Sequence, residues 1–155
     1  MQQVVQEIKN LSIGFTSKKG EQISILKNIS TTINKGETVG IVGESGSGKS
    51  TLALAMMGYV KHGLFTISGE CIYQSNDILK MKNRELENIR GRKIAMIPQN
   101  AGQSLTPNLK IGYQIDEALR LHTNFQKEDR DVKISELLNK VRLPSPETIA
   151  KRYPH

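Results

Sequence analysis

The sequence predicts an α/β fold whose character changes along the chain. Residues 38–42 and 93–97 are compact apolar runs, typical of strands buried on both faces of a sheet. A glycine-rich loop follows the first run at once, and the good helix formers of 50–58 follow that loop without a proline. After about residue 102 the apolar residues recur with a helical period. We therefore expect a mixed α/β part over 1–102 and a helical part over 103–155.

The other elements of the first part are predicted mainly from alternation and turn residues. Apolar and polar residues alternate loosely over 4–13, and short strands are expected at 23–25 and 29–33. The residues of 67–73 again predict a β-strand. Residues 84–90 predict a short polar helix before the second buried run.

Two amphipathic helices are predicted in the second part. In each, apolar residues lie three, four, seven or eight positions apart, so they share one helical face. The first face consists of Ile111, Ile115, Ala118 and Leu119. The second face consists of Ile134, Leu137, Leu138 and Val141.

The composition excludes several classes of protein. With 155 residues, 37% hydrophobic and 24% charged, the chain is long enough to bury a core and is not disordered in composition. The net charge of +7 comes from scattered basic residues rather than a basic arm, so nucleic-acid binding is not expected. The single cysteine excludes an internal disulfide framework. We expect no signal peptide, and the apolar run 52–57 is far short of the roughly 20 residues that span a bilayer.

The strongest motif lies in the glycine-rich loop. Residues 43–50, Gly-Glu-Ser-Gly-Ser-Gly-Lys-Ser, match the pattern G-x-x-x-x-G-K-[ST] at every fixed position. Glycines permit unusual backbone angles and close approach, so successive N–H groups can point into one anion-binding concavity. Lys49 would place a charge at the β- and γ-phosphates, and the Ser50 hydroxyl would ligate Mg²⁺. The alternative is a flexible glycine turn.

Several longer segments carry a resemblance to a known family. Residues 40–51 resemble the phosphate loop of the nucleotide-binding subunits of ABC transporters, and are most similar to the peptide and nickel importer group. The run Ile89–Gln99 resembles the "IRG…IAMI.Q" of that group. Further agreement is found at Asn28–Ser30, Lys35–Thr38, Ser104–Pro107 and Lys151–His155, the last resembling the "YPH" before the signature motif. The resemblance covers essentially the whole chain.

The resemblance implies a P-loop NTPase fold. Its parts would be an antiparallel β subdomain, the start of a RecA-like parallel-sheet core and part of a helical subdomain. It also implies ATP and Mg²⁺ as cofactors. The residues implied to bind the nucleotide are Phe15, Gly43, Glu44, Ser45, Gly46, Ser47, Gly48, Lys49, Ser50 and Thr51.

Two of the implied roles have a simpler alternative. Phe15 would stack on adenine, but could be a core aromatic on an N-terminal strand. Gln99 would touch Mg²⁺ and the attacking water, which a neutral amide can do, but could be a polar residue that ends a strand. The implied catalytic residues are thus Lys49 and Gln99, and the implied metal ligands Ser50 and Gln99. Pro98, Asn100 and Ala101 depart from the aromatic, Asp and Pro that the group often shows there, in the loop that faces the permease in the family.

The family's other catalytic motifs are not found in the sequence. There is no signature motif, no apolar run ending in Asp-Glu and no switch histidine. Asp116-Glu117 is an Asp-Glu pair, but its surroundings have helical periodicity, so we expect a solvated helix face. His155 matches the residue before the signature. We therefore expect a truncated product that is marginally stable, oligomeric or partner-dependent, and that hydrolyses no ATP alone.

The function implied is that of an ATP-binding subunit of a peptide or nickel importer, coupling ATP binding and hydrolysis to transport. Its partners would be membrane permease subunits and a second ATPase subunit, at the cytoplasmic face of the membrane. One alternative is a non-catalytic nucleotide-binding fragment that regulates a full-length subunit. Another is a soluble ABC-type ATPase that acts on ribosomes or DNA.

Overall fold

A computed structural model describes residues 3–155, apart from the side chains of Ala101 and Gln103. The chain divides into two compact units, Met1–Arg90 and Gly91–His155. This division precedes the boundary expected at residue 102, because 93–97 does not belong to the sheet of the first unit. Within the described residues, every helix is too short or too polar to cross a membrane.

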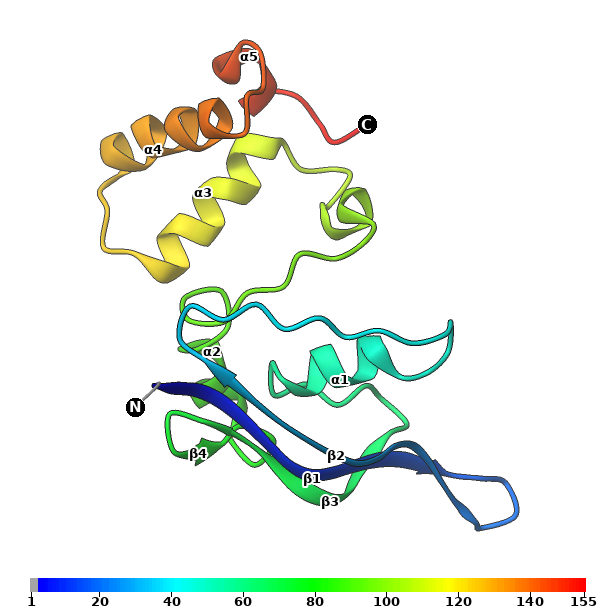
Figure 1. Ribbon diagram of the computed structural model, residues 1–155. Helices are drawn as coiled ribbons and strands as arrows, with labels where there is room; N and C mark the ends of the chain where they lie inside the picture. The colour runs from blue at the N-terminus through cyan, green and yellow to red at the C-terminus, as the bar shows by residue number, and fades with distance from the viewer. Residues whose placement is uncertain (1–2) are drawn as a thin grey trace. The chain divides into compact units, whose positions relative to one another are not determined.

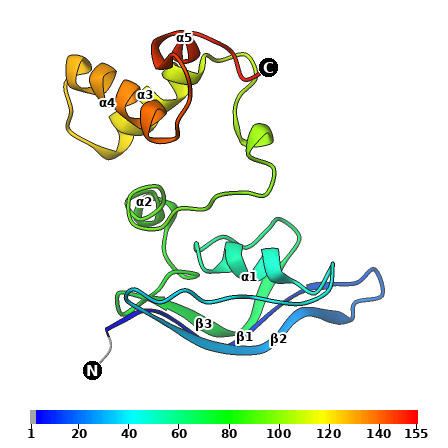
Figure 2. The ribbon, with the colours of Figure 1, turned by 45° about the horizontal axis from the view of Figure 1, so that its top comes forward.

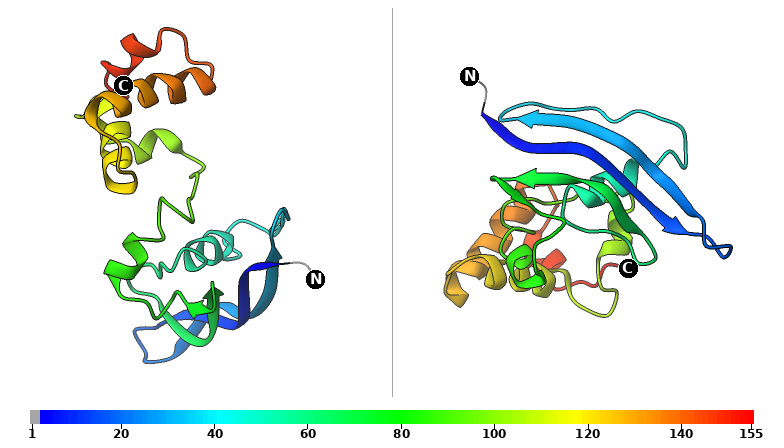
Figure 3. Two further views of the ribbon diagram at one scale, coloured as in Figure 1. Left: turned by 90° about the vertical axis from the view of Figure 1, so that its left-hand side faces the viewer. Right: turned by 90° about the horizontal axis from the view of Figure 1, so that it is seen from below.

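The first unit is built on an antiparallel sheet with the strand order β2-β1-β3-β4. Figure 3 shows β1 between β2 and β3. The strands are β1 (Val4–Thr16), β2 (Gln22–Asn34), β3 (Phe65–Tyr73) and β4 (Asn76–Asp77). The expected strands at 23–25 and 29–33 are therefore two parts of one long strand.

One face of this sheet is the core of the first unit. Ile8, Leu11 and Ile13 of β1 are fully buried. The interval of three from Ile8 to Leu11 breaks strict alternation, because β1 has irregular register near Asn10, whose φ is +48°. Opposite this bulge is Gly69, with a φ of +81°, where a Cβ atom would collide with the backbone of Asn10. Only glycine fits at this point of β3.

The helix α1 (Lys49–Ala55) packs on this sheet (Figure 2). Its buried residues are Leu52 and Ala55. It is shorter than the expected 50–58, because the chain turns at Met56–Gly58. The helix α2 (Asn83–Glu87), labelled in Figure 1, follows β4. It buries Leu86 and ends before the expected residue 90. Burial of one helical face explains why such short helices are stable here.

The single cysteine lies in this core. Cys71 on β3 is fully buried, and its sulfur accepts a hydrogen bond from Gln6 Nε2 at 3.3 Å. Burial raises the pKa of the Cys71 thiol to about 11; the Gln6 hydrogen bond lowers it and the Asp77 charge raises it. The thiol is therefore protonated at neutral pH.

The prediction of two strands buried on both faces is wrong. Residues 37–44 and 95–98 have no regular secondary structure. Val42 is 97% exposed and Ile97 is 92% exposed. A strand of a parallel sheet forms only when a neighbouring strand pairs with it, and its faces are buried only by elements packed on the sheet. Among residues 3–155 no strand pairs with either segment. The 38–42 segment instead forms one wall of an apolar cavity of about 360 Å³ whose other walls are β2 and α1.

The second unit is helical, as the sequence predicts (Figure 3). Its elements are η1 (Ala101–Ser104), α3 (Ile111–His122), α4 (Lys127–Lys140) and α5 (Pro146–Ala150). Acidic residues in the first turn of α4 and Lys140 in its last turn complement the helix dipole. Ile134 and Leu138 of α4 are buried, whereas Val141 is 66% exposed. Gly112 of α3 lies so close to Ala150 of α5 that a Cβ atom would be 2.9 Å from the Ala150 carbonyl.

Candidate functional site

The candidate site is the glycine-rich loop between residue 42 and α1. Gly46 and Gly48 have φ angles of +83° and +89°, which L side chains rarely adopt. Gly48 is the N-cap of α1, so the second of these angles sets the direction in which the helix leaves the loop. Both glycines thus have the conformational role that the sequence predicts for them.

Gly43 lacks the unusual backbone angle that is expected of the glycines in this loop. It has no positive φ, but a Cβ atom there would lie 2.7 Å from Ser47 Oγ. At Gly48 a Cβ atom would also lie 2.7 Å from Leu26 Cδ2 of β2. Both neighbouring atoms are side-chain ends that can move, so the positive φ angles of Gly46 and Gly48 are the stronger reason for glycine in this loop.

The Lys49 side chain folds back over the loop. Its Nζ donates hydrogen bonds to the carbonyl oxygens of Gly43 at 2.8 Å and Glu44 at 2.6 Å. The ammonium group is therefore held within the turn of the loop by main-chain atoms. A charge fixed in this way is available to an anion that enters the loop.

The remaining residues of the motif differ in exposure. Ser50 is exposed in the first turn of α1, and Thr51 is half-buried. Glu44, Ser45 and Ser47 are exposed in the loop itself. Because Leu52 and Ala55 anchor α1 to the sheet, Lys49 and Ser50 are presented from a packed element rather than from a free loop.

Phe15 and Gln99 lie outside the loop. Phe15 is half-buried near the end of β1, where it pairs with Ile23 of β2. Gln99 belongs to the second unit, where it is exposed in a bend that follows Pro98. Their roles toward adenine and Mg²⁺ stay predictions.

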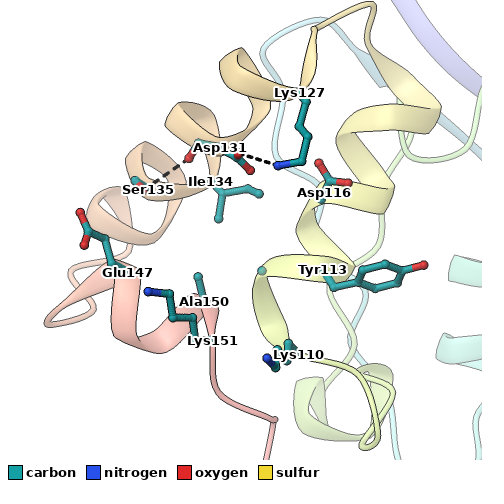
Figure 4. Close-up of a pocket in the computed structure, with 11 residues that line it drawn as sticks. Lys110, Tyr113, Asp116, Lys127, Asp131, Ile134, Ser135, Glu147, Ala150 and Lys151 are labelled. Carbon is teal, nitrogen blue, oxygen red and sulfur yellow. Dashed lines mark hydrogen bonds and ion pairs between the residues drawn. The ribbon is translucent and has the colours of Figure 1, made fainter.

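A cavity in the second unit is chemically unlike the loop. It has a volume of about 440 Å³ and lies among α3, α4 and α5 (Figure 4). Half of its charged lining residues are in ion pairs: Lys127 Nζ lies 3.0 Å from Asp131, and Asp116 lies 2.6 Å from Nε of Arg130, which is outside the cavity lining. Ile134 and Ala150 supply apolar wall. We therefore place no nucleotide there.

The Asp-Glu pair of the second unit lies in a helix, as expected. Asp116 and Glu117 are in the middle of α3. Asp116 is not simply solvated, however, because its carboxylate accepts a hydrogen bond from Arg130 of α4. Asp116 therefore joins two helices, Glu117 is exposed, and the pair does not end a buried strand.

Sequence reasoning missed two residues that hold α1 from its other end. Gln6 Nε2 donates to the Met56 carbonyl at 2.6 Å, and Arg90 donates to the carbonyls of Met57 and Gly58. The available signal was weak: Gln6 is a polar residue in an otherwise alternating strand, and Arg90 belongs to the "IRG" run.

The comparison with family models decides the affiliation. The model described as ABC transporter matches residues 26–155, which include the phosphate loop and the whole second unit. The chain belongs to the ABC transporter family. Its fold is that of the ABC ATPase cassettes, as far as the antiparallel sheet, the phosphate loop and the helical unit extend.

Known ABC proteins resemble the chain over nearly its full length. It is 37% identical to the oligopeptide transport ATP-binding protein OppD of Bacillus subtilis, covering 96% of this chain and 42% of OppD. It is 36% identical to the glutathione import ATP-binding protein GsiA of Escherichia coli K12, covering 96% of this chain and 25% of GsiA. The chain thus spans less than half the length of these relatives.

A solved cassette supports the same assignment. The dimeric ATP-binding cassette MJ0796, in a post-hydrolysis state bound to ADP and Pi, matches with a TM-score of 0.81 and 27% identity. The match covers 97% of this chain and 62% of that cassette.

Proposed function

We propose that this ABC chain binds Mg·ATP at residues 43–51. The observation that carries the proposal is the loop geometry, in which Gly46 and Gly48 turn the backbone and the Lys49 ammonium is fixed inside the turn. In this proposal Lys49 holds the β- and γ-phosphates, while the backbone N–H groups and Glu44–Ser47 surround them. Phe15 would stack on the adenine.

The donor set of the chain fits Mg²⁺ bound through phosphates. Mg²⁺ prefers oxygen ligands and retains waters, so few protein ligands are needed. The Ser50 hydroxyl and the Gln99 amide oxygen are of this type. In the described part of the chain no group of three His, Cys, Asp or Glu side chains is placed to hold a metal alone. When bound, the metal would neutralise phosphate charge.

We further propose that the chain serves an importer of peptides. Support comes from OppD and GsiA, whose names assign them to oligopeptide transport and glutathione import. The partners would be permease subunits at the cytoplasmic face of the membrane and a second ATPase subunit, as in the dimeric cassette. Nickel is the other solute that the resemblance allows. We propose no nucleic-acid partner.

This part of the proposal is tested by co-purification. The tagged chain is expressed with the permease subunits of a peptide importer and, in parallel, with those of an unrelated ABC importer. Retention of the peptide permease alone supports the assignment. Retention of neither permease when an intact second ATPase subunit is also present contradicts it.

The 155-residue chain alone is expected to show no steady ATP turnover. Phosphoryl transfer to water needs a group that positions the water as well as a phosphate cradle, and the sequence has no apolar run ending in Asp-Glu. Phosphate release is measured with excess Mg·ATP, with the Lys49→Ala variant as the background. Multiple turnovers by the wild-type chain that disappear in the variant would show this expectation to be wrong.

A further inference from the structure

A turn that contains Gly58 ends α1. Tyr59 N–H donates to the Leu54 carbonyl at 3.0 Å, and Gly58 N–H donates to the Ala55 carbonyl at 2.9 Å. Gly58 has a φ of +71°. These features define a Schellman motif, which satisfies the carbonyls of Leu54 and Ala55 but leaves the next three without helical partners.

Two distant side chains satisfy those three carbonyls. Gln6 Nε2 of β1 donates to Met56 O at 2.6 Å. Arg90, just after α2, donates through Nε to Met57 O at 2.9 Å and through Nη2 to Gly58 O at 2.8 Å. The guanidinium also lies 6.0 Å from the centre of the Tyr59 ring, at the outer limit of a cation–π contact.

Arginine suits this position for geometric and electrostatic reasons. Its planar fork offers two donors at once, so a single side chain can reach two consecutive carbonyls, which a lysine ammonium does less well. A positive charge is also favoured at the carbonyl end of a helix. Arg90 is half-buried, which limits the screening of this interaction by solvent.

We propose that Arg90 is a positioning residue for the phosphate loop. With seven residues, α1 is too short to keep its direction without tertiary contacts. Arg90 fixes the carbonyl end of this helix, and Lys49 and Ser50 lie in its first turn. Loss of the Arg90 contacts would therefore let the helix tilt and would displace both residues. The proposal rests on the proposed binding of Mg·ATP at this loop.

The test compares Arg90→Met with Arg90→Lys and a matched control. Arg84→Met removes an arginine of α2 that is exposed, so it changes charge and size without touching α1. Hydrogen–deuterium exchange is followed separately in 45–58 and in β1 and β3. Mg·ATP affinity is measured by calorimetry on the same samples.

We expect Arg90→Met to raise amide exchange in 45–58 while β1 and β3 stay protected. ATP affinity should fall about threefold to tenfold, the range for partial loss of one charge-assisted hydrogen bond. Arg90→Lys should show a smaller rise in amide exchange and a smaller fall in ATP affinity than Arg90→Met. Arg84→Met should behave as the wild type in both measurements.

Each contrary outcome has a distinct meaning. A wild-type chain that binds no Mg·ATP overturns the proposed function. Exchange in 45–58 that is unchanged in Arg90→Met overturns the positioning role whether or not ATP binds. Exchange that rises equally across the whole sheet shows Arg90 to be a general stabiliser and also overturns it. If Arg90→Met does not fold, the proposal requires that Arg90→Lys raise amide exchange in 45–58. Unchanged exchange in this variant contradicts the proposal.

Discussion

Replacing Lys49 by alanine is expected to lower the affinity for Mg·ATP at least tenfold. The ammonium is held by the carbonyls of Gly43 and Glu44 at 2.8 and 2.6 Å, inside the turn that would receive the phosphates. A hydrogen bond to a charged group contributes about 1.5–3 kcal/mol, and about 1.4 kcal/mol corresponds to tenfold in affinity. Calorimetric titration of both proteins with Mg·ATP measures the difference directly.

Lys61→Ala is the matched control for this experiment. Lys61 lies in the same unit, is exposed and has no role in the loop, so its removal changes net charge by the same amount. Its ATP affinity should equal that of the wild type. If Lys49→Ala and Lys61→Ala bind Mg·ATP equally well, the assignment of the loop as a nucleotide site is wrong.

Leu11→Ala lowers the free energy of unfolding of the first unit by about 2–5 kcal/mol, the usual range for a buried leucine. The Leu11 side chain is 0% exposed and lies between Ile8 and Ile13 in the core of β1. Its removal leaves a cavity that this close-packed layer cannot fill without strain. Chemical denaturation followed by circular dichroism gives the change.

Val42→Ala provides the comparison within the same unit. Val42 is 97% exposed, so its truncation should change stability by less than about 0.5 kcal/mol. If Leu11→Ala is unfolded in water, Ile13→Val offers a milder test, with an expected loss of about 0.5–1.5 kcal/mol. Equal losses from Leu11→Ala and Val42→Ala would contradict the core described for this sheet.

Features that depend on neighbouring residues were predictable from the sequence. The period of Ile134 and Leu138 predicts α4, and the structure buries both side chains. The glycine spacing predicts the left-handed turns at Gly46 and Gly48. In these cases the conformation is determined by residues that are close together in the sequence.

Features that depend on distant segments were not predictable in the same way. The composition of 38–42 favours a strand, but strand formation needs a pairing partner, and composition carries no information about that partner. The contacts of Arg90 with Met57 and Gly58 join residues more than thirty positions apart, with no periodic pattern to reveal them. The contact of Gly48 with Leu26 of β2 likewise joins distant segments, so the sequence alone did not reveal it.

Because Cys71 is buried, the reactivity of its thiol reports local opening of the first unit. A thiol with a pKa near 11 that is 0% exposed reacts with an alkylating or disulfide reagent only after the strands around it separate. Since this is the single cysteine, every labelled molecule records one opening of the β1–β3 region. The labelling rate under native conditions therefore measures how often this part of the sheet opens. Slower labelling as Mg·ATP is added would connect occupancy of the loop with closure of the sheet beneath it.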